Sequence, residues 1–161
     1  MRWYFTALRK YAVFRGRARR REYWMFFLWN AIFGFLISRV DVLLGTWDEE
    51  SRMGQISSLY SLAMVVPNFA IIVRRLHDIG KSGWNVLWLL FALFMGRFLL
   101  VTSFPGADTG SEHKDFMMLM IMLLSVSVVV ATPIWFLMML VQDSQPGTNR
   151  YGPNPKAIQA S

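Results

Sequence analysis

Four long apolar runs constrain this sequence more than any other feature. They cover about residues 23–44, 56–73, 84–104 and 116–141 of the 161 residues. Each is close to the roughly 20 residues that an α-helix needs to cross the hydrocarbon core of a bilayer. The chain is 55% hydrophobic and 17% charged, and its charges lie in blocks between the runs. We therefore predict an all-α polytopic membrane protein, a four-transmembrane-helix bundle in a single membrane domain over residues 1–161.

The first run is also the place where a secretory leader would be sought. At residues 23–44 it is too long for the apolar region of a signal peptide, and it lacks a clear small-x-small cleavage site. We expect it to remain in the protein as a membrane anchor.

Lysines and arginines are distributed unevenly between the two sides of the predicted spans. Thirteen fall on one side: eight before the first span, three in the second loop and two in the tail. The other two connections hold only Arg52 and Lys114. Cytoplasmic loops carry the excess of basic residues in membrane proteins, so both termini are expected in the cytoplasm. This topology explains the net charge of +7 better than nucleic-acid binding does, and no nucleic-acid partner is expected.

The N-terminal segment, residues 1–22, is neither apolar nor typical of a loop. Tyr4, Ala7, Leu8 and Tyr11 recur at helical spacing, with basic residues mainly elsewhere around the turn. This pattern predicts an amphipathic interfacial helix that lies in the headgroup layer with its aromatic side toward the lipid.

Much of the loop RRLHDIGKSGW, residues 74–84, has an architectural explanation. Arg74 and Arg75 suit the C-terminus of a helix, where cations interact favourably with the helix dipole and can reach headgroups. Gly80 is a predicted helix stop, Ser82 a predicted N-cap and Trp84 an interfacial aromatic residue.

Three polar segments are predicted at the same membrane face: FRGRARRREYW, the loop, and the tail over residues 142–161. A helix N-terminus beside arginines suits a phosphate or carboxylate. We therefore expect a site for an anionic phospholipid headgroup or an acidic partner, such as another membrane protein or a second copy. The predicted anion-binding residues are Arg17, Arg20, Arg21, Arg74, Arg75, Lys81 and Arg150. The residues expected to shape the site are His77, Asp78, Ser82, Trp84, Asn149 and Tyr151.

These segments also carry a family resemblance. FRGRARRREYW, RRLHDIGKSGW and GTNRYGPNP resemble the hallmark segments of the domain-of-unknown-function 805 family, over about residues 11–155. The resemblance implies a small multi-helix protein of the bacterial cytoplasmic (inner) membrane. It implies no activity, because the family has none established.

Catalysis is the first alternative function. His77 can act as a general base near neutral pH, with Asp78 or Asp143 to orient it, in an enzyme of lipid or phosphate chemistry. However, adjacent residues on a helix point about 100° apart, and no hydrolase, zinc or phosphate-loop motif accompanies them. A non-enzymatic role is therefore favoured. With no cysteine and two histidines, neither a metal nor a cofactor is expected.

A small transporter or channel subunit is the second alternative, because Arg39, Asp41 and Arg97 fall inside predicted spans. Arg97 and Asp41 are predicted to pair between helices. Transport would need more intramembrane polar groups than these, so the pair is expected to fix helix packing.

Overall fold

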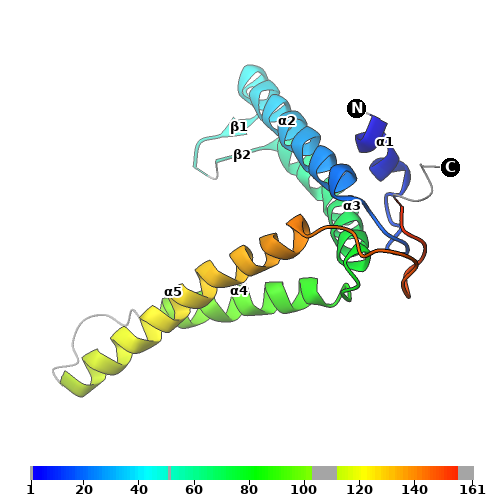
Figure 1. Ribbon diagram of the computed structural model, residues 1–161. Helices are drawn as coiled ribbons and strands as arrows, with labels where there is room; N and C mark the ends of the chain where they lie inside the picture. Colours follow the sequence, from blue (N-terminus) through cyan, green and yellow to red (C-terminus); the bar gives the residue numbers. More distant parts are fainter. Residues whose placement is uncertain (1, 51, 103–111, 156–161) are drawn as a thin grey trace. The chain divides into compact units, whose positions relative to one another are not determined.

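Five helices and one short hairpin make up the computed structural model, which describes residues 2–50, 52–102 and 112–155. The helices are α1 (Arg2–Arg9), α2 (Arg20–Leu44), α3 (Gln55–Asp78), α4 (Asn85–Thr102) and α5 (Glu112–Val141). Strands β1 (Trp47–Asp48) and β2 (Met53–Gly54) join α2 to α3 (Figure 1). Four segments, α2, α3, α4 and residues 116–141 of α5, are long and apolar enough to cross a membrane. The four predicted spans are thereby confirmed.

The chain divides into two compact units. The first comprises residues 1–82 and 143–161, and so holds α1, α2, α3, the β hairpin and the tail. The second comprises residues 83–142, with α4 and α5.

The connection between α2 and α3 is fixed by Asp41. This fully buried carboxylate accepts hydrogen bonds from the backbone N–H groups of Ile56 (3.0 Å) and Ser57 (2.8 Å), and from Thr46 Oγ1 (2.6 Å). The residue that precedes α3 is Gly54, which has no side chain to cap the helix. Asp41 supplies the missing N-cap from the last turns of α2, and it locks this end of the hairpin.

Helix α3 extends to Asp78, five residues beyond the predicted end of its span. Arg74, Arg75 and Asp78 are buried in the first unit, so the charged last turn packs against protein and does not point into the headgroup layer. Gly80 then adopts the left-handed conformation (φ 76°) that ends the helix, as predicted.

Helix α1 forms where an amphipathic helix was predicted, but its aromatic face contacts protein. Tyr4 and Ala7 are buried, and the Tyr4 ring lies 5.4 Å from the Phe26 ring and 5.2 Å from the Phe33 ring. The tyrosine that was expected to face lipid therefore packs on α2.

In the second unit, α4 and α5 approach closely at small residues. A Cβ added at Gly96 would lie 2.8 Å from Val129 Cγ2, and Ser125 of α5 is fully buried. Small residues at such contacts are typical of helix pairs in membranes, where backbones must come close to gain van der Waals contact.

Replacing Gly54 with alanine should destabilise the turn between α2 and α3. The added Cβ would overlap the Asp41 carboxylate and displace it from the N-terminus of α3. We expect a loss of about 2 kcal/mol in stability, which is typical of overpacking at a buried site. Thermal unfolding in detergent, followed by circular dichroism, measures the change.

Gly34→Ala is the matched control for this substitution. Gly34 lies within helix α2, and a Cβ added there would lie 3.8 Å from the Tyr60 ring, which is an ordinary van der Waals distance. Alanine there should be neutral or stabilising, by up to about 1 kcal/mol. Equal destabilisation by both variants would contradict the role given to Asp41.

Candidate functional site

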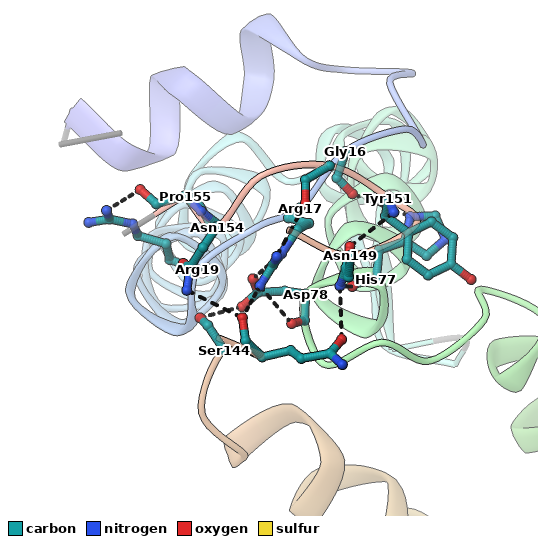
Figure 2. Close-up of polar contacts among 12 residues, drawn as sticks. Gly16, Arg17, Arg19, His77, Asp78, Ser144, Asn149, Tyr151, Asn154 and Pro155 are labelled. Carbon is teal, nitrogen blue, oxygen red and sulfur yellow. Dashed lines mark hydrogen bonds and ion pairs between the residues drawn. The ribbon is translucent and has the colours of Figure 1, made fainter. Parts of the chain in front are cut away.

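Arg17 lies at the centre of a polar site (Figure 2). The site is at the Asp78 end of α3, away from the β strands that precede Gln55. Arg17 Nε donates to Asp78 Oδ1 at 2.9 Å, and its Nη2 donates to the carbonyls of Asp78 (3.2 Å) and Gln145 (2.5 Å). Its Nη1 donates to the carbonyls of Gly147 (2.8 Å) and Gly152 (3.3 Å). All five guanidinium donors are used. One side chain thus joins the N-terminal segment, the end of α3 and the tail.

Asp78 gathers three donors around one carboxylate. Besides Arg17, it accepts from Arg75 Nη1 at 2.5 Å and from Ser144 Oγ at 2.6 Å. Both ion pairs are shielded from solvent, because the three charged side chains are at most 1% exposed. A buried charge is tolerated only when it is paired and hydrogen-bonded, and this carboxylate meets that condition.

A second buried pair fixes α3 to the first turn of α2. Arg74 Nη1 lies 3.1 Å from Glu22 Oε1, and Arg74 Nε donates to the Ala70 carbonyl at 3.3 Å. The backbone N–H of Ala18 donates to the Arg74 carbonyl at 3.0 Å. We call Arg17, Arg74, Arg75, Glu22 and Asp78 the arginine cluster.

The tail packs against the end of α3 by rings and amides. The Tyr151 ring is stacked on the His77 ring, 3.7 Å away and nearly parallel at 6°. Asn149 Nδ2 donates to the His77 carbonyl at 3.0 Å, and the Gln145 N–H donates to the Asp78 carbonyl at 2.9 Å. These contacts explain the Gly, Asn and Pro content of the tail, which must turn sharply to present its carbonyls.

The structure thus brings together the three segments that were expected to converge, but it uses them differently. Arg17, Arg74 and Arg75 were predicted to hold an external anion, and their guanidinium groups instead bind the protein's own carboxylates and carbonyls. Sequence reasoning missed Glu22 and Ser144 as their partners. The signal for Glu22 was its position as the lone acid within FRGRARRREYW.

The other predicted anion-binding residues are exposed, with Arg20 Nη2 3.3 Å from Asp143 Oδ1 in a solvent-accessible pair. Ser82 is partly buried. Trp84 belongs to the second unit, where it lines an apolar surface recess with Trp88.

His77, the candidate general base, contacts the tail and the N-terminal segment. Its Nδ1 lies 3.3 Å from the Gly16 carbonyl oxygen, and its ring is covered by Tyr151. These contacts account for a histidine here through packing, and the general-base role stays a prediction.

The intramembrane pair likewise stays a prediction, because Asp41 and Arg97 belong to different units. The Asp41 carboxylate has donors from the α2–α3 turn. Arg97 is exposed beside apolar residues of α4, among them Phe94 and Phe98.

In a comparison with known proteins, one family model covers every residue of the arginine cluster. The model of a family described as "Protein of unknown function (DUF805)" matches residues 11–153. Inner membrane protein YhaH of Escherichia coli (strain K12) is 39% identical over 114 residues, which cover 71% of this chain and 93% of YhaH. Inner membrane protein YhaI of the same strain is 40% identical over 115 residues, with 71% and 92% covered. No solved structure matches the chain.

Arg17→Lys should release the tail from the end of α3. Lysine keeps the charge, but it cannot present five donors in a planar fork, so several tail carbonyls lose their partner. We expect the free energy of unfolding to fall by about 3 kcal/mol, as for a broken buried ion pair. Proteolysis within residues 143–155 should also become faster. Limited proteolysis with mass spectrometry reports the tail cleavage.

The exposed neighbour Arg15 provides the control, as Arg15→Lys. Unchanged tail protection in Arg17→Lys, or equal loss in both variants, would show that Arg17 does not hold the tail.

Proposed function

We propose a lipid-binding function for this chain, which belongs to the DUF805 family of proteins of unknown function and is an inner-membrane protein. The proposed ligand is the headgroup of an anionic phospholipid. The binding surface, here called the basic rim, consists of Arg15, Arg21, Lys81 and Arg150. From the charge asymmetry of the loops, we place this surface at the cytoplasmic face.

The observation that carries the proposal is the separation of the charges at this end of the hairpin. The two acids of the arginine cluster, Glu22 and Asp78, are buried and already paired with arginines. The four side chains of the basic rim are exposed. The exposed Asp143 is paired with Arg20. The four rim cations therefore leave a positive excess at the solvent-facing surface, which suits phosphate.

The arginine cluster also positions the rim. Arg15 is two residues from Arg17, and Arg21 directly precedes Glu22. Lys81 follows the helix stop after Asp78, with its N–H bonded to the Leu76 carbonyl at 2.9 Å. Arg150 lies with its guanidinium carbon 4.7 Å from the Tyr151 ring centroid. Cations held in place by a rigid framework lose less conformational freedom on binding than cations on flexible loops.

Removing rim charges should lower affinity for anionic lipid without unfolding the protein. The test variant is Arg15→Gln, Arg21→Gln and Lys81→Gln together, which leaves the arginine cluster intact. Each basic residue near an anionic surface contributes about 1 kcal/mol to the binding free energy, so we expect the triple variant to lose about 3 kcal/mol of binding free energy. This is on the order of a hundredfold in the binding constant. Native mass spectrometry with competing phosphatidylglycerol and phosphatidylethanolamine measures the preference.

The matched control carries the same change in charge at exposed arginines outside the rim: Arg39→Gln, Arg52→Gln and Arg97→Gln. It should keep the preference for phosphatidylglycerol. If wild type shows no preference, or if both triple variants lose it equally, the basic rim is not a headgroup site.

A further inference from the structure

Helix α1 contacts both helices of the α2–α3 hairpin. The Tyr4 ring packs against Phe26 and Phe33 of α2, and its hydroxyl lies 3.5 Å from that of Tyr60 in α3. The hydroxyl of Tyr11, just beyond α1, donates to the Ala63 carbonyl. Figure 1 shows α1 beside the two long helices. Contacts with both helices fix where α1 docks.

These contacts lie deep within the membrane-spanning helices. At 1.5 Å per residue, Phe33 is about 20 Å along α2 from Arg20, and Ala63 is about 22 Å along α3 from Asp78. The hydrocarbon core of a bilayer is only about 30 Å thick. Since α2 and α3 both span the membrane, the Tyr4 and Tyr11 rings reach its interior, well below the headgroup layer predicted for this segment.

The docked helix covers a polar pair inside the hairpin. Tyr60 donates its hydroxyl to Asn30 Oδ1 at 2.6 Å, linking α3 to α2 at this depth. Polar side chains within a span are unfavourable in contact with lipid and often mark functional positions. Tyr4, only 5% exposed, brings its hydroxyl to this pair and its ring over the neighbouring phenylalanines.

An opposing tendency acts at the C-terminal end of α1. Arg9 and Lys10 are exposed there, and cations are unfavourable in hydrocarbon but attracted to headgroup phosphates. A helix of eight residues is also too short to be stable alone, so α1 depends on its docking contacts. The segment is therefore held in the membrane interior by Tyr4 and drawn toward the surface by its cations.

We propose that residues 2–14 form a re-entrant strap, which enters the bilayer, docks on α2 and α3 through Tyr4 and closes over the Tyr60–Asn30 pair. Release of the strap moves it to the headgroup layer and uncovers the pair. The proposal rests on contacts within the first unit and not on lipid binding by the basic rim.

The test measures the depth of the strap in the full-length protein. The chain has no cysteine, so Phe5→Cys gives a single labelling site on an exposed residue next to Tyr4. A nitroxide attached there is compared with nitroxides at Leu36→Cys, exposed within α2, and Arg21→Cys, exposed at its beginning. In phosphatidylethanolamine–phosphatidylglycerol vesicles, the relative accessibility to oxygen and to a water-soluble nickel chelate reports the depth of each label.

We expect the label at position 5 to resemble that at position 36 and to shift toward that at position 21 when Tyr4→Ala is added. Tyr60→Phe, which removes only a hydroxyl, should cause a smaller shift in the same direction. Phe14→Ala removes an exposed aromatic ring from the same segment and should cause none. A label at position 5 that already matches position 21 in otherwise unchanged protein would overturn the proposal, as would equal shifts from Tyr4→Ala and Phe14→Ala.

Discussion

The buried ion pair between Arg17 and Asp78 is the interaction on which the rest of the first unit depends. Removing two charges from water is costly, and the pair is stable only because the remaining donors and acceptors are also satisfied. Carbonyls of the tail accept the remaining hydrogen bonds of the Arg17 guanidinium group, while Arg75 and Ser144 donate further hydrogen bonds to the Asp78 carboxylate. The tail therefore supplies acceptors without which the guanidinium group would be buried and incompletely bonded.

The hairpin of α2 and α3 is held by polar contacts at both ends. Asp41 caps α3 at the β turn, and the arginine cluster closes the opposite end. Between helices in lipid the hydrophobic effect contributes little, because acyl chains are as apolar as leucine. Hydrogen bonds and close packing must then specify which helices pair and in what register, and the two polar ends do so.

One basic block serves two purposes because its residues face different directions. Arg17 is buried and Glu22 is buried beside Arg74, whereas Arg15 and Arg21 face outward. The inward residues fix the fold, and the outward ones form the surface proposed to meet anionic lipid. The arrangement ties the rim to the fold, since each rim cation lies within three residues of a side chain that makes contacts in the site.

The sequence by itself determined the four spans and the uneven distribution of basic residues, because apolar length and charge are local properties that need no partner to be known. It also indicated that three polar segments converge at one membrane face. It did not determine which arginines are buried, because Arg17, Arg21 and Arg74 are chemically alike and differ only in what surrounds them. Tertiary structure decided that, by bringing Glu22, Asp78 and the tail carbonyls to some guanidinium groups and leaving others exposed. It likewise placed the α1 aromatic residues on α2 and α3, because an amphipathic pattern shows which face is apolar but not whether lipid or protein covers it.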